Sequence, residues 1–155
     1  MQHDRPPSAL SIAGSDSGGG AGIQADLKTF AAHRVHGLSA IAALTAQHTR
    51  DVTAVNVPPM EFLRAQLDAC FDDFDIRAVK LGMLATAEVI GVVAEAVRAH
   101  RPGTVVVDPV MVATSGSSLM KTDAVQTLID ELLPLSTVIT PNIPEGEILS
   151  SEKIE

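Results

Sequence analysis

Aromatic residues are scarce in this 155-residue chain, which has four Phe and neither Trp nor Tyr, so aliphatic side chains and Met must build the core. One cysteine, Cys70, excludes an internal disulfide framework, and its apolar helical neighbours favour a buried thiol. No apolar run is long enough to span a membrane, and residues 1–7 are too polar for a signal peptide. These absences predict a cytoplasmic globular protein with no membrane partner.

Basic residues are also in deficit, because 11 Lys and Arg stand against 19 Asp and Glu and give a formal net charge of −8. Nucleic-acid binding needs basic side chains gathered on one face, so this balance argues against it. The five His show no metal-ligand spacing. An anionic ligand such as ATP would require backbone N–H groups, a helix N-terminus or a bound cation.

The chain does contain a regular alternation of short apolar segments and helix-periodic segments. Strands are expected at residues 9–13, 38–44, 52–57, 76–81, 104–108 and 137–140. Helices are expected at about 21–34, 58–74, 86–99 and 122–134, and from residue 144 onward. Short connections between them predict a single α/β domain over residues 1–155, with an open, mostly parallel sheet and helices on both faces.

Five residues fall at or just after the ends of predicted strands, namely Gly14, Gln47, Met83, Asp108 and Asn142. Ligands of open parallel sheets bind beyond the carboxyl ends of the strands. We therefore expect these five residues to line one rim of the sheet.

Residues 14–22 form a segment dense in glycine. Gly20, Gly22 and Ala25 match a dinucleotide-binding fingerprint, but the acidic residue that should end the second strand is missing. A P-loop is excluded because no Gly-Lys-Ser/Thr follows. A flexible turn is the structural alternative, although so many glycines between a strand and a helix more often let the backbone approach a ligand.

Residues 13–30, AGSDSGGGAGIQADLKTF, resemble almost letter for letter the opening motif of bacterial hydroxymethylpyrimidine kinases of the ribokinase superfamily. Further stretches agree in order at residues 43–47 (ALTAQ), 80–84 (KLGML), 107–111 (VDPVM) and 139–145 (ITPNIPE). The resemblance spans about residues 8–150. It implies a ribokinase-like fold, represented here by its substrate-binding portion.

The same resemblance implies an activity. Family members transfer the γ-phosphate of ATP, with Mg²⁺, to 4-amino-5-hydroxymethyl-2-methylpyrimidine and then to its monophosphate, a step in thiamine diphosphate biosynthesis; the full-length family implies a homodimer. The family continues to a Gly-Thr-Gly-Cys/Asp motif that supplies the anion hole and a catalytic base or activating residue. That motif is not among these residues, so we assign no catalytic residue and expect the C-terminal nucleotide portion to be absent.

Gln47 has a chemistry that supports its predicted role independently. A carboxamide presents an acceptor beside a donor, which suits an aminopyrimidine edge with an exocyclic amine next to a ring nitrogen. The resemblance places the counterpart of Gln47 on the pyrimidine. Without it, an amide that caps a strand end would explain Gln47 equally well.

The other predicted substrate-binding residues depend more on the resemblance. Met83 and Val110 resemble an apolar wall against the substrate ring, although Met83 taken alone would more often be a core residue. Gly14 and Ala21 belong to the Gly-rich motif. Asp26 could bind substrate, but it could equally favour the positive end of the helix that follows the Gly-rich segment.

Asp108 and Glu145 form a carboxylate pair, each after a predicted strand, and both are predicted metal ligands. Asn142 and Glu145 resemble the superfamily's Asn-x-x-Glu motif, which organises Mg²⁺ through water near the ATP phosphates, so Asn142 is predicted to contact the nucleotide. Without the resemblance, Asp108 would be interpreted as a turn residue before Pro109, and Glu145 as a residue at the start of a helix that complements the helix dipole. Lys80 could approach phosphates, but a snorkelling lysine at a strand end is the preferred interpretation.

Two other functions stay open. The first is a pyridoxine or pyridoxal kinase of the same superfamily, whose substrates lack the exocyclic amine that Gln47 would bind. The second is a non-catalytic, truncated binding fragment, which the missing motif favours and which the reading frame beyond Glu155 would test.

The sequence departs from the family pattern at His48, where Asn is usual, and at Thr114, where Lys is common.

Overall fold

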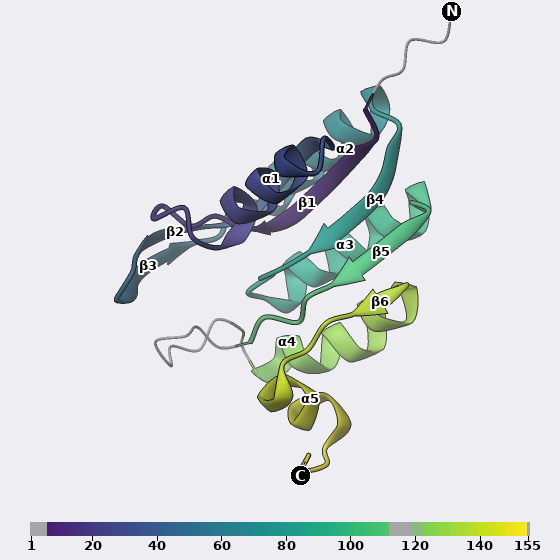
Figure 1. Ribbon diagram of the computed structural model, residues 1–155. Helices are drawn as coiled ribbons and strands as arrows, with labels where there is room; N and C mark the ends of the chain where they lie inside the picture. The colour runs from purple at the N-terminus through teal and green to yellow at the C-terminus, as the bar shows by residue number, and fades with distance from the viewer. Residues whose placement is uncertain (1–5, 112–119, 121, 155) are drawn as a thin grey trace, which may run out of the picture.

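The computed structural model describes residues 6–111, 120 and 122–154, over which six strands form one sheet in the order β3-β2-β1-β4-β5-β6 (Figure 1). The strands are β1 (Ser8–Gly14), β2 (His36–His48), β3 (Asp51–Asn56), β4 (Ile76–Leu81), β5 (Thr104–Val107) and β6 (Val138–Ile139). The helices are α1 (Gly22–Ala32), α2 (Met60–Asp73), α3 (Ala87–His100), α4 (Thr122–Thr127) and α5 (Ile143–Ser150). A π-helical segment, Leu128–Leu132, and a 3₁₀ turn, Leu133–Leu135, continue α4.

All strand pairs are parallel except one. β1 pairs with β2 and β4, β4 with β5, and β5 with β6 in parallel, whereas β2 and β3 form an antiparallel hairpin at the edge. The predicted α/β class and the mostly parallel sheet are confirmed. The chain moves outward from β1 to β2 and then returns to β4 on the other side of β1, so the strand order reverses between β1 and β4. Open α/β sheets bind ligands beyond the carboxyl ends of the strands at such a reversal.

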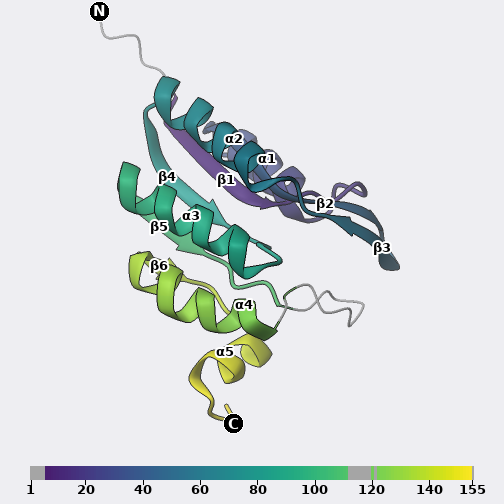
Figure 2. The ribbon, with the colours of Figure 1, turned by 180° about the vertical axis from the view of Figure 1, so that it is seen from behind.

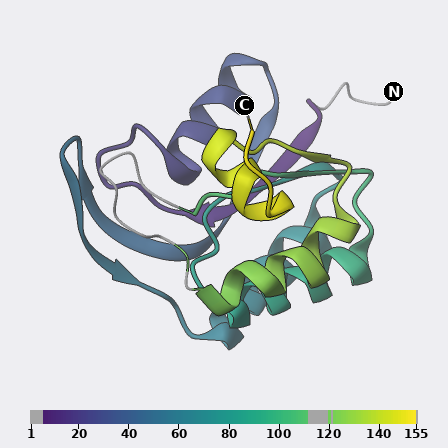
Figure 3. The same cartoon turned by 90° about the horizontal axis from the view of Figure 1, so that it is seen from below.

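Helices cover both faces of the sheet, as predicted. Figure 3 shows α1 and α5 on one face and α2, α3 and α4 on the other, and Figure 2 shows α2 and α3 from that second side. The main core lies between the sheet and α2, α3 and α4. Its fully buried side chains include those of Leu10, Ile12, Leu63, Leu67, Val79, Leu81, Ile90, Val93, Leu128 and Leu132.

α3 illustrates how the sequence fixes these elements. The Thr86 hydroxyl accepts a hydrogen bond from the Val89 N–H at 3.3 Å and so caps the first turn. Val89, Ile90, Val93 and similar residues then recur at helical spacing on the buried side. The helix ends at Arg101, which has a left-handed backbone conformation.

The face that carries α1 is covered less completely. α1 packs on β1 and β2, so the residues of β4 that point to this side, Ala78 and Lys80, keep partial exposure while Val79 and Leu81 are buried on the other side. This opening beside α1, at the carboxyl end of β4, positions the candidate site.

Elsewhere Cys70 is half-buried rather than fully buried, and burial raises the pKa of its thiol.

Two features differ from the sequence-based expectation or extend it. β2 runs to His48, four residues beyond the predicted end of that strand, because it continues as a hairpin with β3. Gln47 therefore lies within a strand rather than after one. In the part of the chain that the structure describes, β6 forms the edge of the sheet opposite β3, with Val138 47% and Ile139 42% exposed. No helix among the described residues is both long and apolar enough to cross a bilayer.

Candidate functional site

A cavity of about 260 Å³ lies at the carboxyl ends of β1, β2, β4 and β5. Asp108 and all six predicted substrate-binding residues line it: Gly14, Ala21, Asp26, Gln47, Met83 and Val110. Residues from five separate segments of the sequence thus meet at one place. A larger groove of about 630 Å³ lies at the opposite ends of the strands, beside Pro7, His36 and Phe74, and includes none of these residues.

The Gly-rich loop forms one wall of the cavity and is organised by a carboxylate within it. Asp16 Oδ1 accepts a hydrogen bond from the Gly18 N–H at 2.7 Å, and Oδ2 accepts from the N–H groups of Gly20 and Ala21 at 2.9 and 2.8 Å. The Gln24 side chain in turn accepts from the Asp16 N–H at 2.8 Å. The N–H groups of Gly18, Gly20 and Ala21, which precede α1, are therefore occupied by Asp16 and cannot bind a phosphate. This agrees with the exclusion of a P-loop.

Asp16 is only 5% exposed, so two effects on its pKa oppose each other. Burial acts to raise the pKa, but hydrogen bonds from the backbone N–H groups of Gly18, Gly20 and Ala21 outweigh burial and hold the pKa below its ordinary value. A depressed pKa means that the carboxylate stabilises the fold at pH values above its unfolded-state pKa of about 3.9. That stabilisation is lost as the pH falls through the lower, folded-state pKa.

We expect Asp16→Asn to lower the free energy of unfolding at pH 7 by about 1–3 kcal/mol, because an amide cannot accept from all three donors. The difference between wild type and variant should shrink as the pH falls below about 4, where the wild-type carboxyl takes up its proton. Urea unfolding at a series of pH values measures both. A difference that is constant with pH would contradict the role of the ionised carboxylate.

Two glycines allow the loop and the strand to approach each other closely. Gly22 has φ +57°, and a Cβ at this position would overlap the Gly14 carbonyl oxygen. A Cβ at Gly14 would overlap the methyl group of Met83, which packs directly on this end of β1. The Gly14 N–H also donates to the Met83 carbonyl oxygen at 3.0 Å. The close packing of Gly14 and Met83 gives the cavity one apolar wall.

Gln47 is half-buried, and Ser17 fixes its backbone. Its N–H donates to Ser17 Oγ at 2.8 Å, and the Ser17 hydroxyl donates to its carbonyl oxygen at 2.6 Å. Its side-chain Oε1 lies 3.3 Å from the oxygen of the Thr45 hydroxyl, which donates its hydrogen to the Ser15 carbonyl oxygen at 2.7 Å. The carboxamide at the rim of the cavity therefore presents both an acceptor and a donor.

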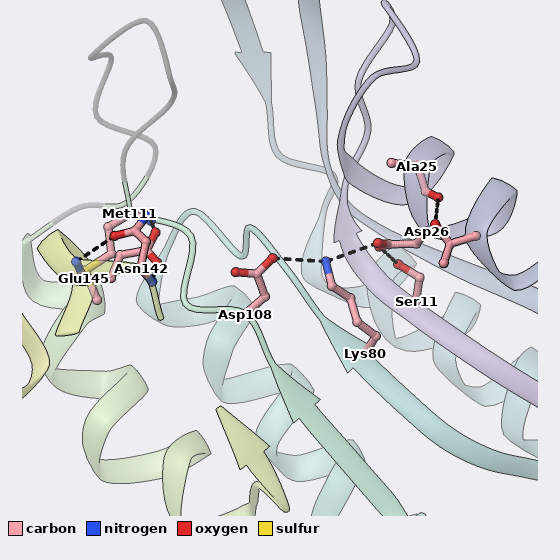
Figure 4. Close-up of polar contacts among 9 residues, drawn as sticks. Ser11, Ala25, Asp26, Lys80, Asp108, Met111, Asn142 and Glu145 are labelled. Carbon is pink, nitrogen blue, oxygen red and sulfur yellow. Dashed lines mark hydrogen bonds and ion pairs between the residues drawn. The ribbon is translucent and has the colours of Figure 1, made fainter. Parts of the chain in front are cut away.

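An ion-pair network crosses the floor of the cavity (Figure 4). Lys80 Nζ lies 3.3 Å from Asp26 Oδ1 and 3.5 Å from Asp108 Oδ2, and the Ser11 hydroxyl donates to Asp26 Oδ2 at 2.6 Å. The preferred interpretation of Lys80 as a snorkelling lysine was wrong, because its ammonium is held between two carboxylates that line the cavity. Asp26 lies beyond the first turn of α1, and its contacts with Ser11 and Lys80 do not support the helix-end alternative.

The structure does not bring Asn142 and Glu145 into the cavity. Instead they form a capping box at the start of α5: Asn142 Oδ1 accepts from the Glu145 N–H and Glu145 Oε2 accepts from the Asn142 N–H, both at 2.9 Å. Glu145 Oε1 also accepts from the Met111 N–H at 3.4 Å, and Glu145 is only 6% exposed. Figure 4 shows this group apart from Asp108 and Lys80. The helix-start alternative for Glu145 therefore describes its observed contacts.

Three further points concern expected site residues. Within the described ranges, no three or more His, Cys, Asp or Glu side chains cluster in a way that could hold a metal ion. His48 is exposed; its Nδ1 accepts from the Arg50 N–H at 3.1 Å, and it lines a polar groove that continues from the cavity past Gln47. Thr114 lies outside the described residues.

Four residues at or beside the cavity were not predicted as site residues: Asp16, Ser11, Gly82 and, because the snorkelling interpretation was preferred, Lys80. One signal was available. Ser11 is the one polar residue of the predicted strand 9–13, and Lys80 is one of two charged residues, with Arg77, in the predicted strand 76–81. A polar residue in a buried strand points to a buried polar contact.

A family profile described as phosphomethylpyrimidine kinase matches residues 16–155. The chain belongs to the phosphomethylpyrimidine kinase family. It is 56% identical over 146 residues to the hydroxymethylpyrimidine/phosphomethylpyrimidine kinase of Rhizobium meliloti, covering 94% of this chain and 54% of that protein. The chain spans about half the length of curated kinases of this family such as those of Rhizobium meliloti, Haemophilus influenzae and Bacillus subtilis.

Solved structures agree with this family. The phosphomethylpyrimidine kinase of Clostridium difficile superposes with a TM-score of 0.91 at 48% identity, covering 96% of this chain and 64% of that one. The pyridoxal kinase of Bacillus subtilis, solved as an ADP complex, gives 0.87 at 38% identity, covering 97% of this chain and 57% of that one. The ribokinase-like fold predicted from the sequence is confirmed.

Proposed function

We propose that this chain provides the pyrimidine-binding portion of a hydroxymethylpyrimidine/phosphomethylpyrimidine kinase. The activity transfers the γ-phosphate of ATP to the hydroxymethyl group of 4-amino-5-hydroxymethyl-2-methylpyrimidine and then to the monophosphate, in thiamine diphosphate biosynthesis. The observation that carries the proposal is the single cavity in which Gly14, Asp26, Gln47, Met83 and Val110 meet.

The cavity suits a small, flat heterocycle with one polar edge. Met83 and Val110 offer apolar surfaces for the faces of the ring, and Met83 packs directly against Gly14. Gln47 presents a donor and an acceptor for an amine and an adjacent ring nitrogen. Asp26, held by Ser11 and Lys80, adds an acceptor for a hydroxyl or amine hydrogen. We therefore propose Gly14, Ala21, Asp26, Gln47, Met83 and Val110 as substrate-binding residues.

The phosphoryl donor and its metal belong to the same proposal. Asp108 fits a Mg²⁺ role, because its carboxylate lies at the carboxyl end of β5 beside the cavity and is 36% exposed. Both oxygens of the Glu145 carboxylate accept backbone N–H groups, so we assign Glu145 and Asn142 to the metal and nucleotide only through water. Bound Mg²⁺ would neutralise the charge of the ATP phosphates.

A vitamin B6 kinase is the second candidate, because the chain is also similar to the Bacillus subtilis pyridoxal kinase. The chain is more similar to the phosphomethylpyrimidine kinases, at 56% and 48% identity against 38%. The Gln47 carboxamide also matches an aminopyrimidine edge better than a pyridine without the amine. We propose a cytoplasmic location for this ATP-dependent activity, and a homodimer for the full-length family.

Gln47→Ala tests the substrate assignment. We expect it to weaken binding of 4-amino-5-hydroxymethyl-2-methylpyrimidine by roughly 1–3 kcal/mol, because the paired hydrogen bonds to the ring edge are lost in a partly desolvated pocket. Isothermal titration measures the affinity. Gln126→Ala, at an exposed glutamine on α4, is the matched control and should leave the affinity unchanged. Unaltered affinity in a folded Gln47→Ala variant would remove Gln47 from the site.

A further inference from the structure

A lysine at the floor of the cavity links two carboxylates from different elements. Asp26 is on α1, and Asp108 follows β5, yet the Lys80 ammonium lies within 3.5 Å of both and only 24% of its side chain is exposed. Figure 4 shows Asp26 and Asp108 on opposite sides of Lys80. The position of each carboxylate therefore depends on the same cation.

The register of the sheet sets this arrangement. Ser11, Lys80 and Val106 are partners across β1, β4 and β5. Ser11 and Lys80 each bind one oxygen of Asp26, so adjacent residues on two strands fix both oxygens of that carboxylate. Asp108 comes two residues after Val106, which brings its carboxylate to the other side of the ammonium.

Gly82, which follows β4, leaves space for the Lys80 ammonium. A Cβ at Gly82 would lie 3.0 Å from Lys80 Nζ and 2.9 Å from the Cβ of Ala13, closer than packed atoms normally approach. The contact with Ala13 alone would favour a glycine at this position, and the absence of a Cβ also leaves space for the Lys80 ammonium.

Removing the ammonium would leave two carboxylates facing each other across a partly desolvated space. Like charges at this separation repel, and the loss of a shared partner leaves both without compensation. The two side chains would then turn apart or toward water. The substrate end at Asp26 and the phosphoryl-transfer end at Asp108 would be displaced together.

We propose that Lys80 is a positioning residue that fixes Asp26 against the pyrimidine and Asp108 toward the phosphoryl-transfer end, without contacting the reacting atoms. The inference rests on the proposed function for the identity of the ligand. It extends that function by coupling the two ends of the pocket through one side chain.

Binding measurements on the full 155-residue chain test this role. Lys80→Met keeps the length of the side chain and removes the charge, and we expect it to weaken aminopyrimidine binding about tenfold or more. Lys80→Arg restores the charge and should bind more tightly than Lys80→Met. Lys153→Met, at an exposed lysine near the C-terminal end of the described residues, should bind as the wild type does. In the Asp26→Asn background, Lys80→Met should cost much less affinity than in the wild type, because a shared interaction makes the two effects non-additive.

Carboxyl ¹³C resonances give a readout that needs no ligand. Lys80→Met should move the resonances of Asp26 and Asp108 together, and Lys153→Met should move neither. Unmoved resonances, or wild-type affinity, in a folded Lys80→Met variant would overturn the inference. If the wild-type chain itself does not bind the aminopyrimidine, the proposed function fails, and the carboxyl resonances alone decide whether Lys80 positions the two carboxylates.

Discussion

The 155-residue chain is expected to phosphorylate hydroxymethylpyrimidine at least about 10²–10³ times more slowly than a full-length relative. A rate loss of this size follows the removal of one preorganised hydrogen-bond donor from the place where charge develops in the transition state. Phosphoryl transfer depends mainly on positioning and on electrostatic stabilisation of the transferred group. The Gly-Thr-Gly-Cys/Asp motif, to which the resemblance assigns the anion hole and the activating residue, is not among these residues. Three N–H groups of the Gly-rich loop, those of Gly18, Gly20 and Ala21, cannot replace that motif, because Asp16 occupies them.

The measurement is ATP-dependent phosphorylation of hydroxymethylpyrimidine by the purified chain, with the 56% identical kinase of Rhizobium meliloti as the control. Substrate binding without turnover is the expected pattern. Turnover within about tenfold of the control would contradict the prediction and would mean that a residue of this chain stabilises the transferred phosphoryl group.

Gly22→Ala is expected to destabilise the fold by about 2–5 kcal/mol, because it combines backbone strain with a steric overlap. Gly22 has φ +57°, a conformation that an L-residue adopts at a cost. The new Cβ would also overlap the Gly14 carbonyl oxygen, a backbone atom that cannot rotate away. To relieve this overlap, the Gly-rich loop would have to move away from β1, which would open the wall of the cavity.

Gly91→Ala is the matched control for this substitution. Gly91 lies within α3, and a Cβ there would meet no described atom within 4 Å. Ala favours a helix over Gly by roughly 0.5–1 kcal/mol, so this variant should be as stable as the wild type or slightly more stable. Thermal unfolding of both variants measures the difference. Equal stability of Gly22→Ala and Gly91→Ala would show that the close approach of the loop to β1 is not required.

The sequence was sufficient to place most strands and the cavity residues. Buried parallel strands are continuously apolar and helices are amphipathic, so the order of elements could be predicted before any contact was known. Gly14 ends β1, and Met83 and Asp108 follow β4 and β5; these strands end at the same edge of the sheet, which explains why the three residues meet. Gln47 also reaches the cavity, although it lies within β2, because that strand extends past the sheet into the hairpin.

The contacts of charged side chains could not be predicted in the same way. Lys80 is one of two basic residues in β4, with Arg77, and only the strand order places it between Asp26 and Asp108. Asp16 looks like one more loop residue until the loop folds around its carboxylate. The motif at Asn142 and Glu145 predicted a metal role, whereas the structure displays a capping box, because spacing i and i+3 suits both.

The central claim is that the cavity binds an aminopyrimidine by its polar edge. Its most direct test is a titration of the 155-residue chain with 4-amino-5-hydroxymethyl-2-methylpyrimidine and with pyridoxal, followed through the side-chain NH₂ resonances of Gln47. The account predicts tighter binding of the aminopyrimidine, with the Gln47 resonances among those that shift most. Tighter binding of pyridoxal, or aminopyrimidine binding that leaves the Gln47 resonances in place, would contradict it.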